Sequence, residues 1–208
     1  MEQFITSITA GFRGSGAPIM ALIVVLIFVS FGLIIERVWF LYFNCGNGKS
    51  FLAVIKKYLN TGEIEKAAKY AQSLPSPLAR VVACILQNRG KGIKTVSRLV
   101  DEVFLQEAPR VNKFLGFLQA IANMSVLIGL AGTIYGFMEA FDSLANVPAA
   151  QRAQALAASI AIVMSSTLWG LIGAIIALLA HALLGNKAEK LLEELDEKAL
   201  KLINQIEG

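Results

Sequence analysis

Three long apolar stretches dominate the hydrophobic pattern of this chain. They cover Pro18 to Phe43, Phe117 to Phe141 and Leu156 to Leu184. A helix needs about 20 mostly apolar residues to cross a hydrocarbon core of roughly 30 Å, so each stretch is long enough to span a membrane. The third contains no Asp, Glu, Lys or Arg, and the first has none before Glu36. The pattern predicts three membrane-spanning helices.

Between the first two stretches, apolar positions recur with a helical period. Helix-breaking residues, including Gly62 and Pro75, separate the segments FLAVIKKYLN, EIEKAAKYAQSL and PLARVVACILQNR. The period continues over residues 95–112 and predicts a helix that leads directly into the second span. Pro109 is a candidate for a kink at that junction.

The C-terminal segment carries a third kind of pattern. Its apolar positions alternate in steps of four and three, which is the spacing of a coiled-coil seam. These positions are 188, 192, 195, 199, 202 and 206. Two interpretations stay open: a seam between copies of the chain, or a helix that folds back on the helices of its own loop.

Composition agrees with a membrane protein. The chain has 208 residues, of which 56% are hydrophobic and 16% charged, which is too apolar for an ordinary soluble domain. The net charge of +4 comes from basic residues scattered over loops rather than gathered in a stripe, so they indicate topology and not binding to nucleic acid. His181, the only histidine, has no second ligand in view, and we predict no enzyme activity, cofactor or resident metal.

The lysines and arginines near the span ends predict the orientation. Ten lie on one side, and only Arg13 and Arg152 lie on the other, so the N-terminus is predicted to be outside. The first stretch is longer than the core of a signal peptide and is interpreted as a retained anchor. The predicted order is a periplasmic segment 1–17, spans 18–43, 117–141 and 156–184, a cytoplasmic helical region 44–116, a periplasmic loop 142–155 and a cytoplasmic amphipathic helix 185–208.

Small residues recur within the second and third spans at helical spacing. Small side chains let helix backbones approach closely in lipid, where van der Waals contact drives association. The candidate packing residues are Gly129, Gly132, Gly136, Gly170 and Gly173.

Hydroxyl side chains also lie inside these spans. Thr133 stands among the glycines of the second span, and Ser165, Ser166 and Thr167 follow one another in the third. A hydroxyl in a membrane helix can bond back to its own preceding turn. Three in succession place hydroxyls on two faces at one depth, so a role in lining a pore stays open beside packing.

Four segments carry a resemblance to a known family. GLAGTIYGFMEAF at 129–141 resembles the second-span signature of the MotA/TolQ/ExbB family of ion-driven motor subunits, most closely ExbB and TolQ. IIERVWFLY at 34–42, SPLARVV at 76–82 and STLWGLIGAIIAL at 166–178 resemble that family's first span, loop motif and third span. The resemblance runs from about residue 18 to 185.

The resemblance implies an arrangement that the residue pattern does not supply. In this family five copies surround the single transmembrane helices of two partner chains of the ExbD/TolR/MotB type, in the bacterial inner membrane. An aspartate on the partner carries the proton or binds sodium. Thr133 and Thr167 match the family's threonines that face this aspartate. A neutral hydroxyl there adds no unpaired charge to the bilayer, where such a charge is costly.

Two positions bear on whether the transported ion is a proton or sodium. Typical ExbB and TolQ chains have a glutamate five residues before the third-span threonine, and this chain has Ile162 there. Ser166 stands where sodium-driven relatives of the MotA branch tend to have a second hydroxyl, so a transient sodium site is an alternative to proton transfer. Glu139 lies six residues beyond Thr133 and is either a charge at the outer mouth or an interfacial carboxylate.

The sequence therefore predicts an all-helical, multi-pass inner-membrane subunit. Its predicted function is to conduct protons or sodium ions with a partner and to drive work in the periplasm or at the outer membrane. The rival interpretation is a non-conducting membrane scaffold, in which the glycines and hydroxyls only pack helices.

Overall fold

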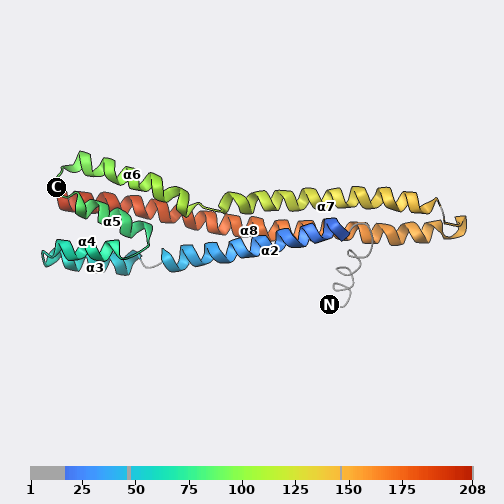
Figure 1. Ribbon diagram of the computed structural model, residues 1–208, viewed down its shortest axis with the longest axis horizontal. Helices are drawn as coiled ribbons and strands as arrows, with labels where there is room; N and C mark the ends of the chain where they lie inside the picture. Colours follow the sequence, from blue (N-terminus) through green and yellow to red (C-terminus); the bar gives the residue numbers. More distant parts are fainter. Residues whose placement is uncertain (1–16, 46–47, 146, 208) are drawn as a thin grey trace. The chain divides into compact units, whose positions relative to one another are not determined.

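The computed structural model describes residues 17–45, 48–145 and 147–207, so the predicted periplasmic segment lies almost entirely outside the described residues. The described residues form helices joined by short turns, and none of them lies in a strand (Figure 1). The helices are α2 (Ala17–Val38) with a π-helical continuation (Trp39–Asn44), α3 (Gly48–Asn60), α4 (Ile64–Gln72), α5 (Pro77–Gln87), α6 (Ile93–Val111), α7 (Leu115–Leu144), a 3₁₀ turn (Ala149–Gln151) and α8 (Arg152–Glu207).

The predicted all-helical fold with three long apolar helices is confirmed. Among the described residues, three helical stretches are long and apolar enough to cross a membrane, namely Ala17–Phe43, Ile93–Leu144 and Ala149–Ile206. The last two include polar helical extensions, because α6 precedes α7 and because α8 continues for 56 residues without a break. The third apolar stretch and the C-terminal amphipathic segment thus belong to one helix.

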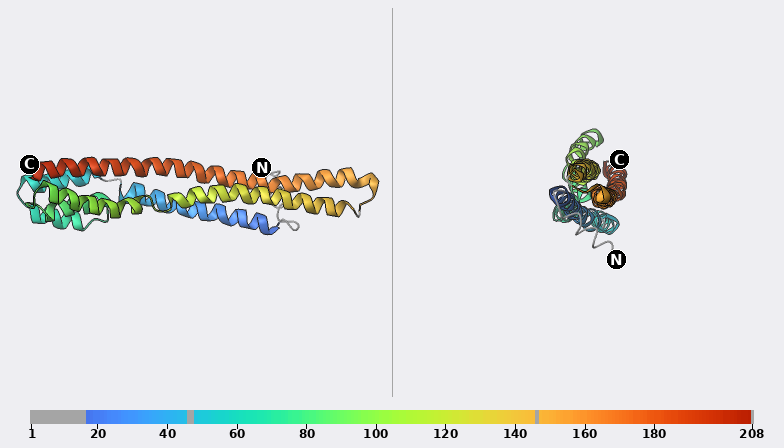
Figure 2. Two further views of the ribbon diagram at one scale, coloured as in Figure 1. Left: turned by 90° about the horizontal axis from the view of Figure 1, so that it is seen from above. Right: turned by 90° about the vertical axis from the view of Figure 1, so that its right-hand side faces the viewer.

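The chain forms two compact units. The first unit comprises the described residues of 1–34 and 116–182, and the second comprises those of 35–115 and 183–208. Within the first unit, α2, α7 and the N-terminal half of α8 run side by side, and α7 is antiparallel to α8 (Figures 1 and 2). Ala122 of α7 is buried against Ala174 and Ala177 of α8. Such small side chains are those that allow close packing of membrane helices.

The second unit has an aliphatic core built around α5. This helix buries most of its side chains, including Val81, Val82 and Ile85. Residues of α3, α4 and α6 pack on the same core, as do Leu195 and Leu202 of α8. The apolar seam of the C-terminal segment is therefore covered by the loop helices of its own chain, which decides between the two interpretations left open above.

The junction between α6 and α7 contains a short interruption. α6 ends at Val111 and α7 begins at Leu115. Between them Phe114 adopts a φ of +65°, a left-handed conformation that a helix cannot contain. Pro109 lies inside the last turns of α6 and not at the break. The two helices follow each other closely, as expected, but the interruption lies at Phe114 and not at the predicted kink position Pro109.

Arg37 stabilises this break from the neighbouring helix. Its side chain is 2% exposed and donates to the main-chain oxygens of Arg110 and Val111, at 3.2 and 3.4 Å. The guanidinium also pairs with Glu36 and lies 5.2 Å from the centre of the Phe114 ring. A cation at the C-terminal end of a helix satisfies its last carbonyls and complements its dipole. Arg37 thus fixes the end of α6.

Candidate functional site: a hydroxyl layer between α7 and α8

Thr167 joins the two long helices of the first unit. Its Oγ1 donates to the main-chain oxygen of Gly129 at 2.9 Å. This bond requires a close approach, and the glycines permit it: a Cβ atom on Gly129 would lie 3.2 Å from the Cα of Thr167 and 3.3 Å from that of Gly170. The predicted packing glycine and the predicted ion-pathway threonine are therefore in direct contact.

Ser166 lies in the same contact. Its Oγ donates to the oxygen of Val163 at 2.9 Å, with a longer approach of 3.5 Å to the oxygen of Gly129. A Cβ on Gly132 would lie only 2.8 Å from this Oγ. The absence of a side chain at Gly132 is what leaves space for the serine hydroxyl.

Thr133 differs from Thr167, because its hydroxyl forms a hydrogen bond within its own helix and not across the α7/α8 contact. Its Oγ1 donates to the oxygen of Leu130 at 2.6 Å, and the residue is partly buried. In an α-helix the amide of residue i+4 donates to the carbonyl of residue i. The amide of Thr133 and the hydroxyl of Thr167 therefore converge on the carbonyl of Gly129. We call Thr133, Ser166 and Thr167 the hydroxyl layer.

The remaining predicted packing glycines lie at helix contacts as well. A side chain on Gly136 would collide with Val163 of α8. A Cβ on Gly170 would lie 2.5 Å from the oxygen of Ser125, and one on Gly173 would lie 2.8 Å from the Cγ1 of Ile27 in α2. The glycines thus serve both the α7/α8 contact and the contact between α8 and α2.

Two buried serines near these contacts were not singled out by the sequence pattern. Ser125 is 1% exposed, and its Oγ donates to the oxygen of Ile121 at 2.8 Å. Ser30 of α2 is also 1% exposed and donates to the oxygen of Ile27 at 2.7 Å. Both hydroxyls bond back to their own helix, as those of Thr133 and Ser166 also do, so this bonding alone does not separate pathway residues from packing residues. Their helical spacing alone could not distinguish them from the hydroxyls of the layer.

The structure does not bring Glu139 into the hydroxyl layer. Its side chain is exposed, six residues further along α7, which corresponds to about 9 Å at 1.5 Å per residue. The side chain of Ile162, at the position of the family's third-span glutamate, lies outside the described part of the structure. Among the described residues, no three side chains of His, Cys, Asp or Glu gather as a metal site would require.

The chemistry available to the hydroxyl layer is that of neutral oxygen. Each of the three hydroxyls donates its proton to a main-chain carbonyl, so its lone pairs can still accept a hydrogen bond or coordinate a cation. No carboxylate belongs to the layer itself. A group that titrates during ion transfer must therefore come from outside this set of residues.

Comparison with known proteins assigns the chain to a family. Residues 73–197, which include the loop motif, all of α7 and α8 as far as residue 197, match the MotA/TolQ/ExbB proton channel family. The chain belongs to this family. The predicted resemblance to this family is confirmed. The first-span segment 34–42 lies outside the matched residues.

A curated member of the family agrees with this assignment. The chain is 35% identical over 114 residues to the putative biopolymer transport protein ExbB-like 3 of Synechocystis sp.. The aligned part covers 54% of this chain and 54% of that protein, so the chain spans about half the length of the curated relative that it matches.

Proposed function

We propose that this chain is the ion-conducting subunit of an inner-membrane motor complex. It acts with a single-span partner of the ExbD/TolR type, whose intramembrane aspartate carries the ion. The complex uses the proton or sodium motive force to drive work in the periplasm or at the outer membrane. The observation that carries the proposal is the hydroxyl layer, in a chain of the proton channel family.

The hydroxyl layer is suited to contact an ion transiently without binding it permanently. Thr133 and Thr167 offer oxygen atoms inside the two apolar helices, and neither adds a fixed charge there. A second charged group beside a partner aspartate would be costly in the bilayer, whereas a hydroxyl accepts a proton-bearing water or a cation at little cost. Ser166 adds a third oxygen, which keeps sodium as an alternative to the proton.

The proposed assembly is the one that the family resemblance implies. Five copies surround two partner helices, with the N-terminus outside and the loop helices in the cytoplasm. The bias of lysines and arginines supports this orientation, because basic residues are retained on the cytoplasmic side. Glu139 then lies toward the outer mouth, where its carboxylate attracts cations.

The experiment is ion flux into liposomes that contain the chain together with its co-purified partner. Flux is measured under a pH gradient and, separately, under a sodium gradient. We expect Thr133→Val with Thr167→Val to reduce flux about tenfold or more, which corresponds to losing a hydrogen bond of about 1.5 kcal/mol to a charged group. Thr167→Ser retains the hydroxyl and should preserve most of the flux.

Ser30→Ala is the matched control. It removes a hydroxyl that bonds to its own helix in α2 and lies outside the hydroxyl layer. Its flux should stay close to that of the parent. Threonine-dependent flux under the pH gradient would identify the proton as the ion, and flux under the sodium gradient would identify sodium.

One observation favours the scaffold interpretation as the second candidate. All three hydroxyls of the layer already donate to main-chain oxygens, as hydroxyls that only pack helices would. If the chain is a scaffold, an assembled complex should show no ion flux under either gradient. The double valine variant should then assemble as the parent does. Flux that is equal in the parent and in the valine variant would contradict the role given to the threonines.

A further inference from the structure

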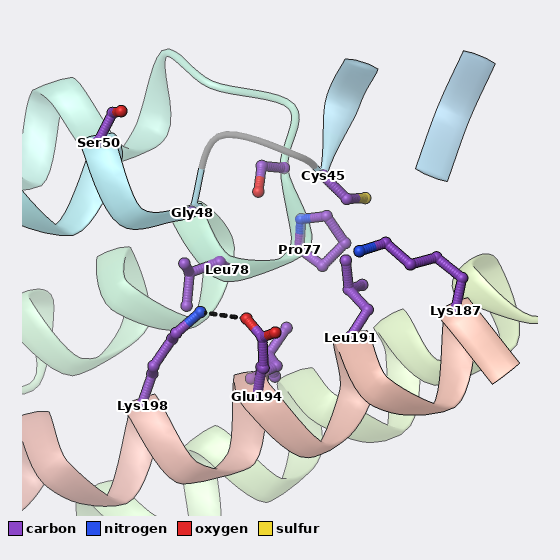
Figure 3. Close-up of a pocket in the computed structure, with 11 residues that line it drawn as sticks. Cys45, Gly48, Ser50, Pro77, Leu78, Lys187, Leu191, Glu194 and Lys198 are labelled. Atoms are coloured by element: carbon purple, nitrogen blue, oxygen red, sulfur yellow. Dashed lines mark hydrogen bonds and ion pairs between the residues drawn. The ribbon is translucent and has the colours of Figure 1, made fainter. Parts of the chain in front are cut away.

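A cavity of about 390 Å³ lies within the second unit, apart from the hydroxyl layer (Figure 3). Its walls are the start of α3 at Gly48, the start of α5 at Pro77, and one face of α8 from Lys187 to Lys198. Cavities of 300 to 1,000 Å³ are typical of small-molecule sites. The volume therefore suits a ligand group rather than a few waters.

Positive charge predominates on these walls. Lys198 donates to Glu194 at 2.6 Å, and this pair is neutral as a whole. Lys187 adds a second ammonium, which Figure 3 shows directed toward Pro77 and Cys45. Burial raises the pKa of the Cys45 thiol to about 11, so the thiol stays uncharged at neutral pH. The charged lining is thus two lysines against one carboxylate.

The two helix starts add to this positive field. Neither α3 nor α5 has an acidic residue in its first turn, and the Ser76 side chain makes no capping hydrogen bond to α5. Lys198 Nζ lies 3.5 Å from where a Cβ of Gly48 would stand, at the start of α3. A cation at the N-terminal end of a helix reverses the usual preference for negative charge there. An anion between these groups would relieve that repulsion.

The cavity begins where the apolar stretches end. Cys45 follows the first stretch, which ends at Phe43, and Lys187 follows the third, which ends at Leu184. The Lys187 ammonium lies 5.7 Å from the centre of the Tyr42 ring, and Tyr42 itself is exposed. Aromatic and basic residues at span ends mark the level of lipid headgroups, and basic pockets there bind anionic headgroups.

We propose that this cavity binds a phosphate group, presented by the headgroup of an anionic phospholipid or by free inorganic phosphate. Lys187 and Lys198 supply the cations, and the uncapped start of α5 supplies the main-chain N–H of Leu78, because Pro77 itself has none. The site is independent of the hydroxyl layer and of the proposed ion conduction.

The test is a binding titration of the detergent-purified chain with three probes. These are short-chain phosphatidylglycerol, short-chain phosphatidylcholine as its zwitterionic counterpart, and inorganic phosphate. We expect saturable binding of phosphatidylglycerol or phosphate, weakened about tenfold or more by Lys187→Gln with Lys198→Gln. Binding of phosphatidylglycerol alone assigns the site to lipid, and equal competition by inorganic phosphate assigns it to the free anion.

The matched control is Lys190→Gln with Lys201→Gln. It removes the same charge from the same helix at exposed positions, and Lys201 pairs with Glu197 as Lys198 pairs with Glu194. Its affinity should stay within about twofold of the parent, because exposed charges contribute little. Equal weakening by both double variants, equal binding of the zwitterionic lipid, or no saturable binding of any probe would overturn the proposal.

A further variant separates binding from folding. Ser76→Asp introduces a preferred N-cap residue at the start of α5 and should maintain or raise the thermal stability. The same carboxylate would repel an anion in the cavity, so binding should weaken about tenfold or more. Unchanged binding in a stable Ser76→Asp chain would count against the site.

Discussion

At the scale of single residues, the α7/α8 contact depends on the absence of side chains. Gly170 illustrates this, because a Cβ there would come within 2.5 Å of the oxygen of Ser125 and 3.1 Å of the Cα of Gly129. Both neighbours are backbone atoms that cannot rotate away. The Thr167 hydrogen bond to Gly129 lies in the same contact and depends on the same spacing.

Gly170→Ala should therefore separate α7 from α8 and lower the stability by about 1–3 kcal/mol, the usual cost of overpacking. Gly185→Ala is the matched control in the same helix, because a Cβ there meets nothing within 4 Å. It should be neutral or stabilising by up to about 1 kcal/mol, since alanine is the better helix former. Thermal unfolding in detergent measures both, and an equal effect of the two changes would refute the close contact.

At the scale of elements, the arginine of the first helix decides where α6 ends. Arg37 is buried, yet it is adequately satisfied, because it contacts two main-chain oxygens, the Glu36 carboxylate and aromatic rings. Similar pairing holds α5 to α6, where the buried Glu107 accepts from Arg80 at 2.8 Å and from Arg110 at 3.1 Å. The Arg80–Glu107 pair thus connects two consecutive helices, whereas Arg37 reaches α6 through hydrogen bonds to its main chain.

Arg37→Gln should destabilise the second unit by about 2 kcal/mol, because hydrogen bonds from a buried charged group contribute roughly that much. The end of α6 should loosen, and hydrogen exchange of the amides of residues 110–112 should accelerate. Arg98→Gln changes an exposed arginine of α6 and should stay within about 0.5 kcal/mol of the parent. Unchanged exchange at the end of α6 in the Arg37 variant would show that the break does not depend on this side chain.

At the scale of the whole molecule, α8 contributes to both compact units. Its apolar half packs with α2 and α7, and its amphipathic half completes the core around α5. Leu202 is 5% exposed in that core, whereas Leu200, two residues away, is 51% exposed. The C-terminal segment is thus a structural part of the second unit.

Leu202→Ala should destabilise the second unit by about 2–4 kcal/mol through a cavity in its core. Hydrogen exchange of α5 should rise, while the mass of the proposed oligomer, measured by size exclusion, should not change. Leu200→Ala should change neither property, because an exposed leucine adds little. Loss of the oligomer without faster exchange in α5 would favour a seam between copies of the chain instead.

Much of the architecture is accessible from the sequence, and the reason is that it depends on local properties. The length of an apolar run decides whether a helix can span a membrane, so the three spans follow from residues 18–43, 117–141 and 156–184 alone. Glycines at helical spacing likewise indicate a close helix contact. The segments around Thr133 and Thr167 also carry the family resemblance, which the match over residues 73–197 confirms.

The tertiary structure decided what depends on residues far apart in the chain. The sequence pattern could not choose the partner of the C-terminal seam, because a period of apolar positions does not say which surface covers it. It missed the break at Phe114, since that break is stabilised by Arg37 from another helix. The acceptor of the Thr167 hydroxyl and the cavity lined by Lys187 and Lys198 likewise exist only because distant segments meet.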